Sequence, residues 1–265
     1  MYYVVPALLA GDTDKLYAST DGGRTFLINA YGLFQTVYFR DVLNGYLVGI
    51  NGEMWHTMNG ARTWNPMGTG TNRNLTDVFF PTSLLGFIVG ENGTLRRTTN
   101  GGVNWQAVNS VTTATLQAIY FTSASTGYAV GAGGVALRTQ NGGTTWVQMN
   151  VNTTTVLRDV YFKNSSIGYI VGDAGTILAT SDGGNTWNSQ PSNTFESLNA
   201  IASVPQTSRI WAVGGAGLIL AHDSNVMKSA SSAALATTAV SPNPFATEIR
   251  LDFPAGVEVQ SSYFG

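Results

Sequence analysis

The chain has 265 residues with a net charge of −2 at neutral pH; 43% of its residues are hydrophobic and only 11% are charged. This length and hydrophobic content suffice for a sizeable core, and the charge balance gives no basic footprint for nucleic acid or an anionic membrane. The sequence has no cysteine, which excludes disulfides and thiolate chemistry, and no apolar run near the roughly 20 residues of a membrane helix.

A six-residue box recurs five times, with an acid or amide first, glycine second and an aromatic residue last. The boxes begin 38, 41, 41 and 41 residues apart. A period of this length, with four short apolar runs in each unit, predicts an all-β propeller with one four-stranded blade per repeat. The first and last residues of the boxes are Asp21 and Phe26, Asn59 and Trp64, Asn100 and Trp105, Asn141 and Trp146, and Asp182 and Trp187.

Three apolar runs precede each box and a fourth starts at its aromatic residue. The first run opens with a leucine in four repeats, the second ends in glycine, and the third follows a tight glycine turn. These runs are rich in β-branched and aromatic residues and bounded by Gly, Asn and Asp, which indicates strands. Many have apolar residues at consecutive positions, so we expect neighbouring blades to cover both faces of most strands. The leucines are Leu75, Leu116, Leu157 and Leu198, and the glycines are Gly49, Gly90, Gly131, Gly172 and Gly214.

The first and last repeats are degraded. The segment Leu8–Gly11 matches a second strand, which leaves almost no chain before it for an innermost strand, and no box follows Gly214. Six repeats are visible, and we predict six or seven blades in the intact parent. Residues 1–10 have a short apolar segment without a basic start and align with the first repeat rather than with a signal peptide. We interpret the chain as a fragment cut at both ends.

The box residues have the chemistry of a hairpin staple. We expect the first side chain to bond to backbone two residues on, the glycines to supply positive φ, the threonine hydroxyl to bond across the turn, and the aromatic ring to pack beneath it. Three of the five boxes have Asn in place of Asp, which a turn tolerates but a catalytic carboxylate does not. We therefore expect a structural role for every box residue.

The boxes resemble the Asp-box, or bacterial neuraminidase, repeat. The full unit, seen best in Leu157–Trp187, resembles the photosystem II stability and assembly factor family of propellers over residues 1 to 226. This resemblance implies the fold. It leaves the function open, because the same repeat occurs in sialidases, xyloglucan-degrading enzymes and sorting receptors.

The repeat pattern stops after Val226. Residues 227–239 are small and polar and are typical of a flexible linker. Residues 240–265 begin with the motif Pro242–Phe245 and an alternating strand pattern, which resembles the first third of the C-terminal sorting domain of the type IX secretion system of Bacteroidetes. That resemblance implies a secreted or outer-surface protein handled by this machinery; the alternative is an ordinary Pro-rich turn before an edge strand. We divide the chain into a propeller (1–226), a linker (227–239) and a partial sorting domain (240–265).

Signals for catalysis are weak. The resemblance to sialidases implies a Phe/Tyr-Arg-Ile-Pro motif and three substrate-gripping arginines, and the nearest approach, Phe39-Arg40-Asp41, lacks Ile-Pro. The two histidines, His56 and His222, fall in different blades, so no histidine cluster can bind zinc. No helix follows the glycine pairs, which argues against a phosphate site. We expect no metal and no cofactor.

Propeller geometry predicts where a ligand would bind. The loops entering the innermost strands and the turns between second and third strands share one face, here called the rim face; the boxes lie on the other, the box face. A second basic set, His56, Arg97 and Arg138, lies seven residues after the second-strand glycine, and the photosystem-factor resemblance implies a basic surface that engages a protein. The predicted rim residues are Arg73, Asp77, Glu91, Gln117, Arg158, Asp159, Asp173 and Asn199, with Asn51 and Asn92 beside them.

Four rim carboxylates, Asp77, Glu91, Asp159 and Asp173, could provide the acid pair of a glycosidase. Other repeats have no acid at the positions of Asp77 and Asp159, which favours a turn-stabilising or channel-lining role. We expect a monomeric, non-catalytic module that binds a protein or a glycan. A carbohydrate-active hydrolase and an assembly factor for a membrane complex such as photosystem II are the alternatives.

Overall fold

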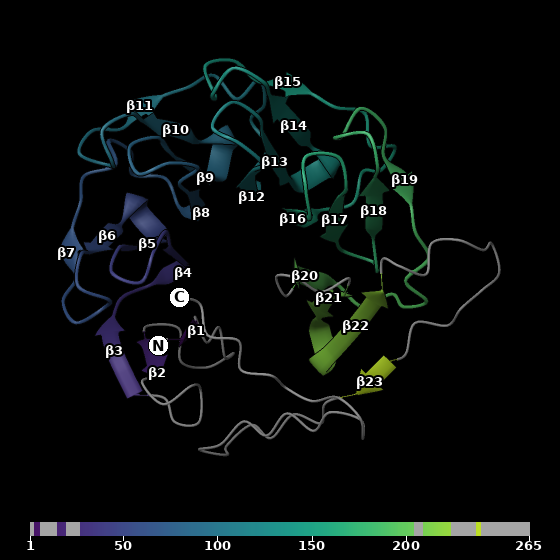
Figure 1. Ribbon diagram of the computed structural model, residues 1–265, viewed down its shortest axis with the longest axis horizontal. Helices are drawn as coiled ribbons and strands as arrows, with labels where there is room; N and C mark the ends of the chain where they lie inside the picture. The colour runs from purple at the N-terminus through teal and green to yellow at the C-terminus, as the bar shows by residue number, and fades with distance from the viewer. Residues whose placement is uncertain (1–2, 6–14, 20–26, 204–208, 224–236, 240–265) are drawn as a thin grey trace.

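The computed structural model describes residues 3–5, 15–19, 27–203, 209–223 and 237–239. Within them the chain forms five four-stranded antiparallel sheets and one three-stranded sheet, each a meander of consecutive strands. The sheets lie around a common centre, as Figure 1 shows. The predicted all-β propeller is thus confirmed with five four-stranded blades. The three-stranded sheet consists of β1 (Tyr3–Val5), β2 (Lys15–Ser19) and β3 (Leu27–Tyr31).

The four-stranded blades share one order from the centre outward. The innermost strands are β4 (Phe34–Phe39), β8 (Leu75–Phe79), β12 (Leu116–Phe121), β16 (Leu157–Phe162) and β20 (Leu198–Ser203). The second strands are β5 (Gly45–Gly49), β9 (Gly86–Gly90), β13 (Gly127–Gly131), β17 (Gly168–Gly172) and β21 (Arg209–Gly214). The third strands are β6 (Met54–Thr57), β10 (Leu95–Thr98), β14 (Ala136–Thr139), β18 (Ile177–Thr180) and β22 (Leu218–Asp223). The outermost strands are β7 (Asn65–Pro66), β11 (Gln106–Ala107), β15 (Val147–Gln148), β19 (Asn188–Ser189) and β23 (Thr237–Ala239).

Two of these sheets bear on the expected ends of the propeller. In the three-stranded sheet β1 pairs with the middle strand β2, with Tyr3 opposite Ser19. The segment Leu8–Gly11, which we expected to form the second strand of this blade, lies outside the described residues. In the last blade β23 pairs with β22, and it lies within the stretch predicted as linker. The sorting-domain motif at 242–245 also lies outside the described residues.

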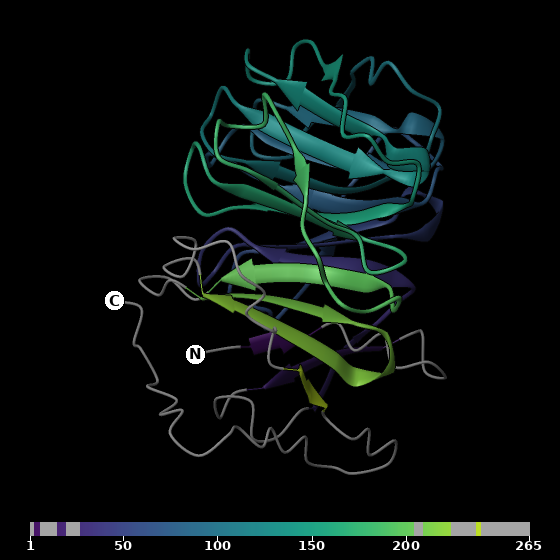
Figure 2. The same cartoon turned by 90° about the vertical axis from the view of Figure 1, so that its right-hand side faces the viewer.

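The strands run across the thickness of the ring, as Figure 2 shows, so their connections fall on two opposite faces. One face carries the turns between first and second strands and the boxes. The other carries the turns between second and third strands, which are one-turn 3-10 helices in four blades, and the connections from one blade to the next. The 3-10 helices are η1 (Ile50–Gly52), η2 (Glu91–Gly93), η3 (Ala132–Gly134) and η4 (Gly215–Gly217).

The second strands form the driest layer of the first four four-stranded blades. Every residue of β5, β9, β13 and β17 is buried, whereas the outermost strands β7, β11, β15 and β19 are exposed. The glycine that ends each second strand has a steric cause: a Cβ on Gly172 would lie 2.2 Å from the backbone oxygen of Val156. The connection to the next innermost strand therefore lies directly against the end of the second strand.

The boxes staple the third strand to the fourth. Asn141 Oδ1 accepts the backbone N–H of Thr145 at 3.0 Å, and Asn141 Nδ2 donates to the Thr145 hydroxyl at 2.8 Å. The side chain thus reaches backbone four residues on, not two as expected, because two successive residues with positive φ, here Gly142 and Gly143, lengthen the turn. A buried threonine that we did not single out, Thr139, completes the staple: its hydroxyl accepts the N–H of Gly143 at 3.0 Å.

The same staple recurs in the boxes that begin at Asn59, Asn100 and Asp182, with Thr57, Thr98 and Thr180 in the role of Thr139. The box Trp105, Trp146 and Trp187 are buried, as the sequence predicted. The first box, Asp21 to Phe26, lies outside the described residues.

Aromatic residues of the innermost strands join neighbouring blades. Tyr38 donates to the backbone oxygen of Phe80 at 3.0 Å, and Tyr120 donates to that of Phe162 at 3.0 Å. Each partner lies 42 residues on, one blade away. Since each blade can cover its apolar faces only with its neighbours, blade-to-blade packing is the main source of stability.

No helix of the described chain is long and apolar enough to cross a membrane.

Candidate functional site

The rim face is built from turns and interblade connections that touch each other. The Ser110 hydroxyl, in the connection to β12, donates to the backbone oxygen of Gly93 in η2 at 2.6 Å. Gly93 N–H in turn donates to the Ala114 oxygen at 2.9 Å. Thr69 repeats the first contact, donating to the Gly52 oxygen at 2.8 Å. Turns and connections therefore form one continuous surface, as expected.

A β-bulge directs one side chain per innermost strand. In β16, Leu157 lies opposite Gly172 and Asp159 opposite Val171, so Arg158 is the extra residue. Bulges of this kind re-aim a side chain and often lie beside functional sites. The same irregularity recurs in the other four-stranded blades and places Gln35, Thr76, Gln117 and Asn199 at the equivalent position.

Arg158 uses this position to reach the second turn of its own blade. Its Nε donates to Asp173 Oδ1 at 2.5 Å, and both side chains remain partly exposed. The guanidinium holds the pKa of the Asp173 carboxyl below its ordinary value, and the Ser197 hydroxyl helps. No hydrogen bond joins the two terminal nitrogens of Arg158 to another described residue, so they stay available to a ligand.

Asp77 and Asp159, both half-buried, join adjacent blades. Asp77 accepts the backbone N–H of Val78 at 2.8 Å on one oxygen and that of Ile119 in the next blade at 2.9 Å on the other. Asp159 makes the same pair of bonds with Val160 and Ile201, both at 2.8 Å. Each carboxyl is an interblade clip, a role that neither the turn-stabilising nor the channel-lining expectation describes.

Burial raises the pKa of both clip carboxyls to about 7, although the backbone N–H donors oppose the rise. The negative charge of Asp159 adds to the rise at Asp77. These two groups therefore titrate near neutrality.

The remaining predicted rim residues divide into bonded and free ones. Glu91 accepts the Asn74 amide at 2.9 Å, and the Asn74 oxygen accepts the N–H of Asn51 at 2.9 Å. Asn74, which the sequence analysis missed, thus bridges the turns of two blades. No side-chain hydrogen bond joins the residues Arg73, Gln117 and Asn199 to the rest of the described chain.

A second missed residue stands beside the Arg158–Asp173 pair. Phe195, in the connection to β20, is 94% exposed. The backbone oxygen of its neighbour Glu196 accepts the N–H of Gly175 at 3.0 Å, and Gly175 lies in the turn that carries Asp173. The signal in the sequence was an aromatic residue where the other connections have Asn72, Thr113 and Thr154.

The second basic set holds blades together and does not form a free patch. Arg97 Nε donates to the Gly142 oxygen at 2.7 Å, and Arg138 donates to Asn185 at 2.6 Å, each in the box of the next blade. His56 stacks on Tyr46 with ring centroids 4.4 Å apart, and burial lowers its pKa.

Arg40, from the segment nearest to the sialidase motif, already has partners within the chain. Arg40 pairs with Asp41 at 3.1 Å and donates to the Ser83 oxygen at 3.0 Å. It follows β4 at the box face, opposite the rim carboxylates. No group of three or more His, Asp or Glu side chains among the described residues could hold a metal ion.

Comparison with known proteins places the chain among β-propellers. The profile of the photosynthesis system II assembly factor YCF48 family matches residues 144–238. A structure of YCF48 bound to D1 peptide has 20% identity and a TM-score of 0.60, over 84% of this chain and 67% of that one. YCF48 from Cyanidioschyzon merolae has 18% identity and a TM-score of 0.63, over 89% of this chain and 74% of that one.

Glycoside hydrolases share the fold as well. The GH74 xyloglucanase from Xanthomonas campestris has 12% identity and a TM-score of 0.67, and the alignment covers 87% of this chain but 44% of the enzyme. No curated protein matches the chain. At these identities the structural similarities show the fold alone. The chain is thus a β-propeller resembling the photosystem II assembly factors.

Proposed function

We propose that this chain is a non-catalytic binding module whose rim face holds an extended segment of a protein partner. The proposal rests mainly on one observation, the presence of Arg158 and Phe195 on the same face. Asp173 fixes the guanidinium through Nε and leaves its terminal nitrogens unpaired among the described residues, while Phe195 is 94% exposed. Asp173 also bonds Ser197, two residues beyond Phe195, so the connection that carries Phe195 adjoins the Arg158–Asp173 pair; we call these residues the Arg158–Phe195 cluster.

A polypeptide suits this cluster better than other ligand classes. The arginine fork donates to carboxylates and backbone carbonyls, and an exposed aromatic ring gains most by burial against apolar side chains. Arginine and aromatic residues are the usual anchors of protein interfaces. The family profile and the similarity to a YCF48 structure that contains a peptide support the same partner class. An assembly factor for a membrane complex would be one form of this function.

The second candidate is a carbohydrate-active hydrolase. The observation in its favour is the pKa of about 7 at Asp77 and Asp159, a value suited to a general acid. Against it, all four rim carboxylates already have partners: the two clips bind backbone N–H groups, Asp173 binds Arg158, and Glu91 binds Asn74.

Selection of a random peptide display library on the immobilised protein tests the proposal. We expect enriched sequences whose binding drops at least ~10-fold in Arg158→Ala and in Phe195→Ala, the scale of an interface anchor. The control is Arg209→Ala, an exposed arginine at the box-face end of β21. Enriched peptides that bind both rim variants as well as the wild type would contradict the proposal.

Turnover of a polysaccharide panel, read as new reducing ends, tests the second candidate. Product formation by the wild type that Asp77→Asn and Asp159→Asn abolish would establish an active site and overturn the non-catalytic assignment. We expect no product from any polysaccharide of the panel, and enriched peptides in the selection.

On the tail sequence alone we also propose that the protein is exported to the outer surface or medium by the type IX machinery. On the six visible repeats we propose a ring of six or seven blades. Replacing residues 242–245 by alanine, in the protein's own host, should retain the protein in the cell. Unchanged export in a fractionation experiment would exclude a sorting role for this motif.

A further inference from the structure

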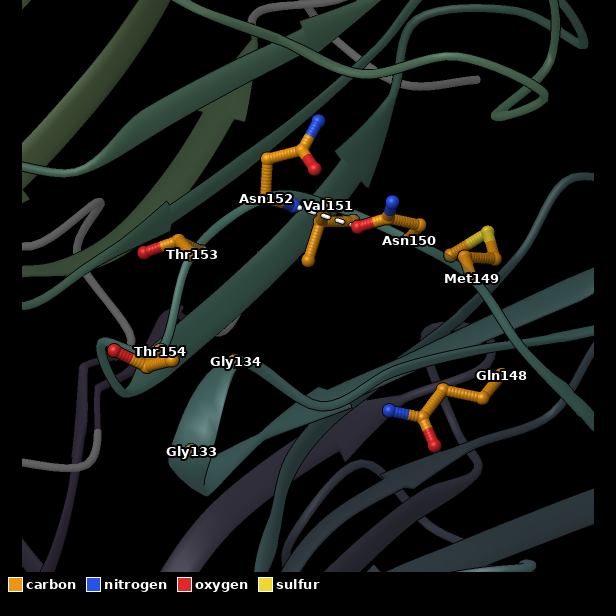
Figure 3. A pocket seen from close by; sticks show the side chains of 9 residues that line it. All are labelled: Gly133, Gly134, Gln148, Met149, Asn150, Val151, Asn152, Thr153 and Thr154. Carbon is orange, nitrogen blue, oxygen red and sulfur yellow. Dashed lines mark hydrogen bonds between the residues drawn. The ribbon is translucent and has the colours of Figure 1, made fainter.

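Two pockets adjoin each other on the rim face between the third and fourth of the four-stranded blades. The first, of about 770 Å³, lies between η3 and the connection that runs from β15 to β16. The second, of about 450 Å³, lies on the other side of Val151–Thr153, against the turn at 174–178 and the segment 187–190. Figure 3 shows the first pocket with its lining side chains. Its volume is in the range of small-ligand sites.

The lining of both pockets is polar and carries no ionisable side chain. In the first pocket three exposed side chains, Gln148, Asn152 and Thr154, have no hydrogen-bond partner among the described residues. Figure 3 shows the Gln148 amide directed toward the turn with Gly133 and Gly134. Amides and hydroxyls both donate and accept hydrogen bonds, as a sugar hydroxyl does. Met149 and the buried Val151 supply apolar surface between them.

A glycine stands at the centre of the turn that lines the pocket. Gly133 occupies the central position of its turn with φ of +69°, and a Cβ built on it meets nothing within 4 Å. The equivalent residues are Asn51, Asn92, Ala174 and Ala216, with φ between 52° and 54°. Side chains are therefore accepted at this backbone position in the other blades, and this blade alone among the five described leaves the space open.

The walls are preformed. A Cβ on Gly134 would lie 1.9 Å from the backbone oxygen of Thr153, so turn and connection are in direct contact. Asn150 Oδ1 accepts the N–H of Asn152 at 3.1 Å, which fixes the connection in the left-handed conformation seen at Asn152. A rigid site loses little conformational entropy when it binds.

We propose that this pocket binds a neutral oligosaccharide. A charged ligand would find no counter-charge in the lining, and a peptide added as a strand would find only two-residue outermost strands, β15 and β19, on either side. Sugar hydroxyls match the free amides and hydroxyls, and the second pocket gives room for further rings. The first pocket shares no lining residue with the Arg158–Phe195 cluster, whereas the second lies beside Asp173 through Ala174 and Gly175.

Affinity electrophoresis of the full chain in native gels containing a neutral β-glucan or a galactomannan tests the inference. Gly133→Asn is the blocking variant, because Asn51 and Asn92 show that asparagine fits this turn. Ala216→Asn makes the same kind of change at the equivalent position of another blade and is the matched control. We expect a neutral polysaccharide to retard the wild type and Ala216→Asn equally, and a loss of at least ~10-fold in apparent affinity in Gly133→Asn and in Gln148→Ala.

Retardation that Gly133→Asn leaves unchanged would overturn the assignment, as would the absence of retardation by every neutral polysaccharide. Retardation by polygalacturonate alone would also overturn it, because a charged polymer would then be the ligand. Arg158→Ala and Phe195→Ala should bind polysaccharide as the wild type does. The polysaccharide result can therefore be interpreted even if the peptide selection fails, and the peptide result can be interpreted even if no polysaccharide binds.

Discussion

The box face repeats its side-chain contacts from blade to blade, whereas the rim face repeats only its backbone. Four boxes make the same threonine and Asx bonds, and their tryptophans fill the same place. The rim turns keep one left-handed backbone, but their first residues are Ile50, Glu91, Ala132, Asp173 and Gly215. Contacts that recur in every blade build the fold, and the variation at the rim distinguishes one blade from another.

The largest expected effect lies on the box face. Trp146→Ala should destabilise the protein by about 3–5 kcal/mol, because it empties a buried site against Phe87 and Phe121. Phe195→Ala at the rim removes a ring of similar size and should change stability by less than about 0.5 kcal/mol, since that ring is exposed. Urea unfolding followed by circular dichroism measures both. Similar costs for the two substitutions would remove the contrast between the faces.

The clip carboxyls should give the next largest effect, and one that depends on pH. Asp159→Ala leaves the N–H groups of Val160 and Ile201 without a partner and should cost about 1–3 kcal/mol. Alanine itself fits the position, as Ala118 and Ala200 show.

The sign of the pH effect follows from the raised pKa. In the folded protein Asp77 and Asp159 stay protonated up to about pH 7, whereas in the unfolded chain they lose their protons near pH 4. Stability from these groups is therefore full below about pH 4 and falls as pH rises to about 7. The cost of Asp77→Ala/Asp159→Ala should be largest at pH 4 and smallest above pH 7. A cost that stays constant from pH 4 to pH 8 would show that the carboxyls do not titrate in this range.

The protein should tolerate replacement of a box asparagine by aspartate, but loss of the side chain should destabilise it. Asn141→Ala loses the bonds to Thr145 and Thr139 and should cost about 1 kcal/mol. Asn141→Asp should stay within about 0.5 kcal/mol, because Asp182 makes the equivalent bonds. Gln148→Ala, which removes an exposed rim amide without a described partner, is the control. An equal loss in the aspartate and alanine variants would show that the amide hydrogen, not the oxygen, holds the turn.

The sequence predicted the strands, the positions of the boxes and the two faces because each depends on residues that recur at a fixed period, but it missed the reach of the box side chain and the threonine that completes the staple. It did not predict what Asp77 and Arg97 bind, because their partners are backbone atoms one blade away, which carry no side-chain signature. Phe195 was missed for the opposite reason: it departs from the repeat, and periodicity directs attention to what is shared. Whether the predicted rim residues bind a ligand stays a prediction.

The smallest effect concerns strain at one rim connection. Val111 has a φ of +57°, a conformation that β-branched residues rarely adopt, and its side chain is half exposed. The equivalent residues Gly70, Asn152 and Asn193 have the same sign of φ with side chains that suit it. Val111→Asn should therefore stabilise the protein by about 0.5–1 kcal/mol, measured by urea unfolding. Val147→Asn, at an exposed valine of β15, is the matched control and should not stabilise, because a strand disfavours asparagine. Equal effects at the two positions would mean that hydration of an exposed valine, and not backbone strain, sets the difference.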